Sequence, residues 1–172
     1  MAKLESVLSQ QTAEDAALWK ILKGTSAETG ESFFASLVKN LAEALETHGA
    51  WVTEYLHHNN HLRALAFWLG GEWVKDYEYD IAETPCEPVI RDRQLVHIPD
   101  NIVALYPGDN DLENLGAVSY MGVPLIDLDG EILGHLAVLH NQPLPEKPRS
   151  LALFKIFAAR AAAELQRLRA EE

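Results

Sequence analysis

The sequence predicts an α+β domain in which helices flank a mostly antiparallel sheet. Two stretches, residues 50–69 and 117–139, each read as a pair of apolar strands joined by a short polar turn, as expected of hairpins. Apolar residues also recur at three- and four-residue steps near both ends of the chain, which is typical of amphipathic helices. A length of 172 residues fits one domain with a substantial core.

The N-terminal part predicts two helices followed by a hairpin. A helix is expected over residues 3–23 and a second over 31–47, and a glycine follows the end of each. Strands are predicted at 50–56 and 61–69, because both runs are rich in aromatic and aliphatic side chains. The polar residues His57 to Asn60 form the turn between these strands.

The middle of the chain predicts short elements. An exposed edge strand with one aromatic face is expected over residues 72–81. A short helix should follow, with Thr84 as its N-cap, Pro85 in its first turn and Glu87 completing a capping box. A strand is predicted at 95–98, and short helices or turns at 101–106 and 111–115.

The last third predicts the most apolar hairpin and a long helix. Asp129 and Gly130 suit a tight turn, and Gly134 suits a place where another group approaches the backbone closely. A helix is expected over residues 149–169. Its apolar residues follow a heptad pattern: Leu151, Phe154, Ala158, Ala161, Leu165 and Leu168.

The composition excludes several classes of function. Acidic residues exceed basic residues by 26 to 14, so a formal charge of -12 disfavours sequence-independent binding to nucleic acid and to acidic membranes. Cys86 is the only cysteine, so no intrachain disulfide and no CxxC metal motif can form. No signal peptide and no membrane-spanning run is recognisable, and a cytoplasmic location is expected.

The late hairpin carries a family resemblance. The residues SYMGVPLID (119–127) and ILGHLAVL (132–139) resemble the corresponding hairpin of GAF domains, the small sensory modules of signalling proteins. The resemblance implies a central six-stranded, mostly antiparallel sheet with the terminal helices on one face. It also implies short helices and loops, about residues 85–115, over a pocket on the other face. The resulting division is an N-terminal helix (1–23), a GAF-like core (24–148) and a C-terminal signalling helix (149–172).

The resemblance selects candidate ligand contacts around the expected pocket. Cys86 lies where a helix N-terminus would favour its thiolate, but flanking glutamates oppose this effect, and a buried structural cysteine is the alternative. His97 and His135 lie on predicted strands, where a hydrogen-bonded structural histidine is the commoner outcome. Tyr106 and Tyr120 bracket the irregular segment and could stack on a planar ligand or fill the core themselves.

Several known GAF activities are disfavoured by missing residues. GAF domains bind cyclic nucleotides, tetrapyrroles, haem or small metabolites, and some have no known ligand. The cysteine–histidine pair of cyanobacterial bilin-binding members is missing from residues 108–111, and the cyclic-nucleotide signature is not apparent. Methionine sulfoxide reduction needs additional cysteines to resolve its intermediate. The HHxxH run at 57–61 reads as a solvated turn rather than a metal site, and no catalytic residue is assigned.

The leading hypothesis is therefore a sensory domain that binds an unidentified small molecule under the segment 85–115 and relays its state through the terminal helices. The alternative is a ligand-free dimerisation or interaction module, and a third is a redox activity of Cys86. No cofactor can be named from the sequence. A homodimer and a fused or separate signalling output domain are the expected partners. The expected dimer-interface residues are Leu4, Leu8, Ala158, Ala161, Leu165 and Leu168.

Overall fold

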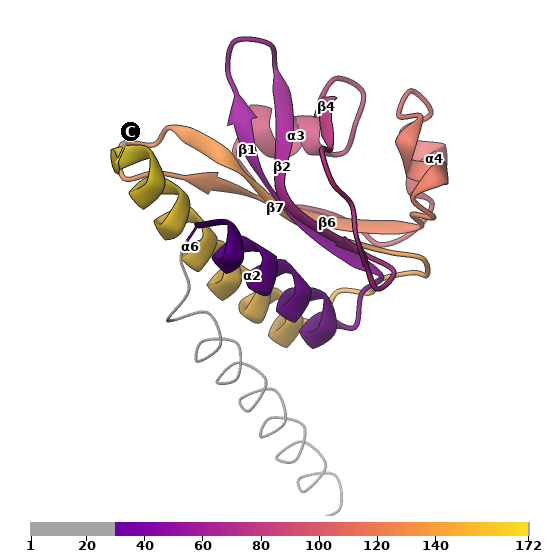
Figure 1. The fold of residues 1–172 in the computed structure, drawn as a ribbon. Coiled ribbons are helices and arrows are strands. Elements are labelled where there is room, and N and C mark those ends of the chain that lie inside the picture. Colours follow the sequence, from indigo (N-terminus) through magenta and orange to yellow (C-terminus); the bar gives the residue numbers. More distant parts are fainter. Residues whose placement is uncertain (1–29, 172) are drawn as a thin grey trace, which may run out of the picture.

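The computed structural model describes residues 30–171, which form three layers (Figure 1). Two long helices lie on one face of an antiparallel sheet, and short helices lie on the other face. The helices are α2 (Gly30–Leu45), α3 (Cys86–Asp92), α4 (Ile102–Leu105), α5 (Asp111–Asn114) and α6 (Pro148–Glu171). The strands are β1 (Gly49–Leu56), β2 (His61–Leu69), β3 (Glu72–Trp73), β4 (Glu78–Asp80), β5 (Val96–Ile98), β6 (Ser119–Ile126) and β7 (Ile132–His140).

The sheet confirms the predicted α+β class and its mostly antiparallel character. Its order is β3-β2-β1-β7-β6-β5, with β4 pairing separately to β2, and every pairing is antiparallel. The two predicted hairpins are β1–β2 and β6–β7, and they meet where β1 pairs with β7 at the centre of the sheet. Strand β7 is buried over nearly its whole length, as its apolar sequence predicts.

The predicted edge strand over residues 72–81 is wrong as a single element. It is divided into β3 and β4 by a break in which Asp76 adopts a positive φ of 56°. The two strands place their side chains on opposite faces of the sheet. Trp73 pairs with Trp68, which packs on the face below α2 and α6, whereas Tyr79 pairs with Leu62 on the other face. This division gives the sheet seven strands rather than six.

Close backbone contact between β1 and β7 explains a glycine in the middle of β7. A Cβ atom on Gly134 would overlap the carbonyl oxygen of Thr53, so only glycine fits this register. The turn between β6 and β7 also follows the prediction: Gly130 has a φ of 84°, and the Asp127 carboxylate accepts the main-chain N–H groups of Asp129 and Glu131.

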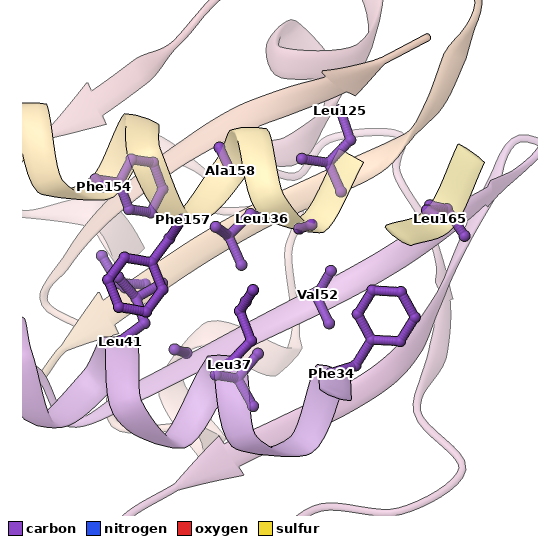
Figure 2. Close-up of a cluster of buried hydrophobic side chains, with 14 of the residues drawn as sticks. Phe34, Leu37, Leu41, Val52, Leu125, Leu136, Phe154, Phe157, Ala158 and Leu165 are labelled. Carbon is purple, nitrogen blue, oxygen red and sulfur yellow. The ribbon is translucent and has the colours of Figure 1, made fainter. Parts of the chain in front are cut away.

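The face of the sheet below α2 and α6 holds the larger hydrophobic core (Figure 2). Figure 2 shows Leu41 of α2 beside Phe157 of α6, whereas Phe34 lies towards the other end of the layer, on the side of Leu165; Leu37 lies between them, and Phe154 follows Phe157 along α6. These side chains are buried and apolar, so their removal from water stabilises the packing of both helices on the sheet.

The heptad pattern of α6 is explained by this core. Ala158, Ala161 and Leu165 are 7%, 0% and 2% exposed, respectively, and lie against the same chain's sheet and α2. The expectation that they form a seam between two copies is corrected accordingly, because they cannot contact a partner without leaving the core. Leu168 is partly buried against the same cluster. Leu4, Leu8 and the predicted helix 3–23 lie outside the described residues.

A buried carboxylate connects the two long helices. Glu164 of α6 is 7% exposed, and its Oε2 accepts a hydrogen bond from the Gly30 main-chain N–H at the first residue of α2. Arg167 donates to the same carboxylate and holds the pKa of Glu164 below its ordinary value. The start of α2 is thereby attached to the second half of α6.

Candidate functional site

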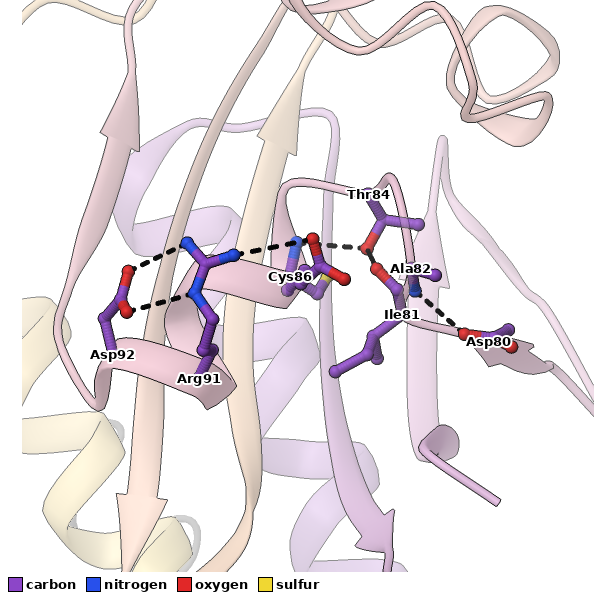
Figure 3. A network of polar contacts seen from close by, with 8 residues as sticks. Asp80, Ile81, Ala82, Thr84, Cys86, Arg91 and Asp92 are labelled. Atoms are coloured by element: carbon purple, nitrogen blue, oxygen red, sulfur yellow. Dashed lines mark hydrogen bonds and ion pairs between the residues drawn. The ribbon is translucent and has the colours of Figure 1, made fainter.

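The opposite face of the sheet is covered by the lid segment, residues 85–115, which contains α3, α4 and α5. The predicted capping box at the start of α3 forms only in part. Thr84 Oγ1 accepts the Cys86 N–H at 3.2 Å and donates to the Ile81 carbonyl at 2.7 Å (Figure 3). The Thr84 N–H donates to the Ile81 carbonyl instead of to the Glu87 carboxylate, and α3 begins at Cys86, one residue later than the sequence suggests.

Cys86 lies at the centre of a buried polar cluster beneath this helix. Its Sγ atom contacts three polar atoms: Tyr79 Oη at 3.2 Å, His135 Nε2 at 3.3 Å and Tyr120 Oη at 3.4 Å. The Tyr120 ring reaches the thiol by lying over Gly122, where a Cβ atom would overlap the tyrosine hydroxyl. Three elements distant in sequence, α3, β6 and β7, therefore meet at one sulfur atom.

His135 is fixed from its other side by Thr53 on β1. Thr53 Oγ1 lies 2.7 Å from His135 Nδ1, accepts the His135 main-chain N–H at 3.1 Å and lies 3.4 Å from the His135 carbonyl oxygen. Two proton arrangements satisfy these contacts. In one, His135 Nδ1–H donates to Thr53 and Nε2 accepts the Cys86 S–H; in the other, Thr53 donates to Nδ1 and Nε2–H donates to the Cys86 sulfur.

The remaining hydrogen bonds complete the network in either arrangement. Trp51 Nε1 donates to Tyr79 Oη at 3.1 Å, Tyr120 Oη donates to the Cys86 sulfur, and Tyr79 Oη shares a hydrogen bond with the same sulfur. Every polar side chain of the cluster then has a partner while Cys86 and His135 both remain neutral. Such a completed network in a dry environment is specific in geometry and costly to interrupt.

Burial sets the protonation of both groups. It raises the pKa of the Cys86 thiol to about 11, although three hydrogen bonds act in the opposite direction. It lowers the pKa of His135 to about 3, because the charged imidazolium would lose its hydration. The resting pair is thus a neutral thiol and a neutral imidazole. A protonated thiol is a poor nucleophile, so Cys86 differs from an activated cysteine.

A small cavity borders this cluster. The volume that the centre of a water-sized sphere can occupy is about 20 Å³, which is room for about one water molecule. Its walls combine aromatic side chains of the sheet with aliphatic and acidic side chains of the lid segment. The main lining residues are Trp51, Tyr77, Cys86, Asp109, Leu112 and Tyr120.

One hydrogen bond holds the lid segment across this cavity. Tyr77 Oη, from the break between β3 and β4, donates to Asp111 Oδ2 at the start of α5 at 2.8 Å. Helix α4 is attached through the buried side chain of Ile102 and through the Ile102 N–H, which donates to the Val118 carbonyl. Helices of four residues are not stable alone, so these contacts keep the lid segment ordered.

The structure brings together only some of the predicted ligand contacts. Cys86, Tyr120 and His135 contact one another, and their contact with a ligand stays a prediction. Tyr106 is partly buried beside this cluster. His97 lies on the other face, where its Nε2 donates to the Leu144 carbonyl at 2.7 Å, next to a separate cavity of about 70 Å³ beneath α6. Its expected place at the lid pocket is therefore wrong.

The sequence did not single out several members of the site. Thr53 lies on a predicted strand without a predicted role, and the sequence favours packing for Trp51 and ranks Tyr79 below Tyr106 and Tyr120 as a ligand contact. The alternation with period two on β1 places Trp51 and Thr53 on the face of His135, which could have marked Thr53 as a buried polar residue. Among the described residues, no group of three or more His, Cys, Asp or Glu could hold a metal ion.

These features define a class of protein: a small α+β module with two helices on one face of an antiparallel sheet and, on the other face, a small covered cavity beside a buried polar cluster. The GAF domain profile matches residues 29–165, and the chain belongs to this family of sensory and regulatory domains. No curated protein sequence matches the chain significantly. Among helices within residues 30–171, none has the length and apolar character needed to cross a membrane.

Solved structures with a similar fold come from several kinds of protein. The GAF domain of a Coxiella burnetii phosphoenolpyruvate-protein phosphotransferase is 21% identical, with a TM-score of 0.78 over 92% of this chain and 95% of that one. The corresponding Acinetobacter domain is 15% identical, with a TM-score of 0.75 over 92% and 96%. Free methionine-R-sulfoxide reductase from Neisseria meningitidis is 16% identical, with a TM-score of 0.75 over 92% of both chains. At these identities the likeness concerns the fold.

Proposed function

We propose that this chain is the sensory domain of a signalling protein and that a small molecule binds in an enlarged form of the cavity under the lid segment. The observation that carries the proposal is the construction of the cavity wall. One wall is a rigid sheet, and the other consists of two four-residue helices held by Tyr77–Asp111 and a few apolar contacts. A ligand that replaces this hydrogen bond would change the order of the lid segment.

The size of the cavity favours a second candidate, a ligand-free interaction module. The chain's own side chains, chiefly Trp51, Tyr77 and Tyr120, occupy most of the space beneath the lid segment. A cavity of about 20 Å³ accommodates a metabolite only if the lid segment moves outward. Ligand binding therefore requires an opened state that the ligand stabilises more than the closed one.

A redox function of Cys86 has less physical support. The thiol is 2% exposed and its raised pKa disfavours the thiolate that would react with an oxidant. Cys86 is also the only cysteine, so an oxidised form would have no partner within the chain. The likeness to a methionine sulfoxide reductase is a likeness of the fold alone. A catalytic role for Cys86 would need a state of the site in which the thiol is exposed.

The relay from this site would pass through β7 to α6, because both faces of β7 are occupied. His135 faces the polar cluster, whereas Leu136, its neighbour on the strand, packs in the core beneath α6. We further propose that the outer face of α6 forms a homodimer. Ile156 is 40% exposed, and Ala159 and Ala163 follow it at steps of three and four.

The proposal is tested by ligand detection together with amide hydrogen exchange. Native mass spectrometry of freshly purified protein should show a retained small molecule, or a metabolite screen should raise the melting temperature. The same ligand should slow exchange in residues 102–115. Tyr77→Phe should accelerate this exchange, whereas Asp111→Asn, which keeps a hydrogen-bond acceptor, should change it less. A bare mass with no stabilising metabolite would favour the interaction module.

A further inference from the structure

A second hollow lies at the other end of α3, away from the lid cavity. It has a volume of about 420 Å³ and is bounded by α3, by the tip of the β1–β2 hairpin and by the start of β7. Its floor consists of three isoleucines that are almost fully buried: Ile81, Ile90 and Ile132. This hollow is much roomier than the lid cavity, which has about 20 Å³. A small molecule fits it without displacing the core.

The rim of this groove carries two guanidinium groups from the end of α3. Arg93 follows the helix with a φ of 53°, a left-handed conformation that glycine or asparagine adopts more readily. Its Nη1 donates to the Gly130 carbonyl at 2.5 Å. Within residues 30–171, no carboxylate lies within ion-pair distance of Arg93, so its charge faces the groove without a counter-ion from the described chain.

Arg91 supplies the second charge but is already paired. It donates two hydrogen bonds to the Asp92 carboxylate, and Glu87 Oε1 lies 3.7 Å from its Nη1 (Figure 3). These pairs are exposed, and exposed ion pairs contribute little to stability. An anion in the groove can therefore replace Glu87 on Arg91 at small cost while Asp92 keeps its place.

The hairpin contributes an aromatic wall with polar edges. The Tyr55 and His57 rings pack edge to face with centroids 4.5 Å apart. His57 Nε2 lies 3.0 Å from the Ile132 carbonyl, and because a carbonyl only accepts, Nε2 donates this hydrogen bond. The ring is thereby fixed against the floor of the groove. Tyr55 Oη donates to Asn60 Oδ1 at 2.6 Å and fixes the second ring.

We propose that this groove binds a small organic carboxylate with an apolar tail. The carboxylate lies between Arg91 and Arg93, whose planar, forked donors match its two oxygens. The tail lies on the isoleucine floor, which an inorganic anion would leave uncovered. The charge argument is local: the chain as a whole carries -12, so an anion is attracted only where guanidinium groups gather.

The test uses hexanoate, with hexanamide and inorganic phosphate as comparison ligands at constant ionic strength. Isoleucine methyl resonances of wild-type protein should shift saturably at Ile81, Ile90 and Ile132, with a Kd on the order of 1 mM for a ligand this small. Hexanamide and phosphate should bind at least tenfold more weakly. Equal binding of hexanamide would overturn the role of the arginines, and equal binding of phosphate would overturn the role of the apolar floor.

Two variants make the assignment specific. Arg93→Gly keeps the left-handed backbone while it removes the guanidinium, so hexanoate binding should weaken about tenfold without loss of the fold. Lys155→Gln, an exposed change on α6, should leave binding unchanged. Undiminished binding by Arg93→Gly would contradict the proposal. Resonances of Leu112 and Ala117, which line the lid cavity, should stay unshifted, so the result is independent of the proposed lid ligand.

Discussion

The sulfur of Cys86 lies 3.3 Å from Nε2 of His135, and both side chains are almost completely enclosed. A cysteine next to a histidine can indicate a nucleophile and its base. Here burial favours the neutral form of each, and a hydrogen bond joins the thiol and the imidazole without transfer of the proton. The pair belongs to a structural network whose members hold the lid segment, the hairpin β6–β7 and strand β1 in one arrangement.

Thr53→Val should destabilise the domain by about 1–3 kcal/mol, because the His135 side chain and main chain both lose a buried partner. Valine has nearly the same shape, so packing is preserved. Thr53→Ser keeps the hydroxyl, so its free energy of unfolding should fall much less than that of Thr53→Val. Urea unfolding of the three proteins measures the difference, and equal losses for valine and serine would show that the hydroxyl is not the cause.

The free energy of unfolding should fall as the pH is lowered through the range below 6.5. The unfolded state protonates His135 near its ordinary pKa of 6.5, whereas the folded state does so only near a pKa of about 3. Between these values only the unfolded state gains the proton, and the loss approaches about 1.4 kcal/mol per pH unit. The slope between pH 7.5 and 5 should be shallower in His135→Gln. An unchanged slope would contradict the low pKa in the folded state.

Native Cys86 should react slowly with iodoacetamide, because alkylation requires an exposed thiolate. The rate should rise strongly when the protein is unfolded in urea, where the same thiol is accessible. Mass spectrometry over time, which follows the mass increase of one adduct, compares the alkylation rate of the native protein with that of the unfolded protein. Reaction of the native protein as fast as the unfolded chain would revive the redox hypothesis.

Two substitutions on α6 separate the core from the proposed dimer face. Leu165→Asp places a charge in the hydrophobic core and should unfold the domain or cost about 3–5 kcal/mol. Ile156→Asp changes an exposed position and should preserve the melting temperature while it weakens self-association. Sedimentation velocity and circular dichroism distinguish these effects. A dimer that is unaffected by Ile156→Asp would exclude the outer face of α6.

The regular elements were predictable because their periodicity reflects burial. Strand β2 begins and ends where its residue pattern predicted, at His61 and Leu69, and the turn at Gly130 follows from its need for positive φ. The edge strand failed because Asp76 adopts a positive φ, which the alternation of side chains over residues 72–81 does not reveal. The heptad residues of α6 were identified correctly as apolar, but periodicity alone does not tell whether a partner helix or the chain's own sheet covers them.

The site was only partly predictable for a related reason. Cys86, Tyr120 and His135 drew attention as residue types capable of chemistry, and they do meet. Their roles depend on Thr53, which lies 82 positions from His135 along the chain. His97 lies on the opposite face because its place on β5 is fixed by pairing with Met121 of β6. Face and partner are properties of register, which one strand's sequence does not contain.

The long helix α6 has a geometric consequence for any partner fused after it. Its 24 residues span about 36 Å, and its buried residues extend from Phe154 to Leu165. Tilting it by about 5° about its first turn would move its far end by about 3 Å, as follows from its length. The same tilt would shift Leu165, which is buried in the core, by about 2 Å. Any movement of the far end of α6 is therefore coupled to repacking of the core beneath it.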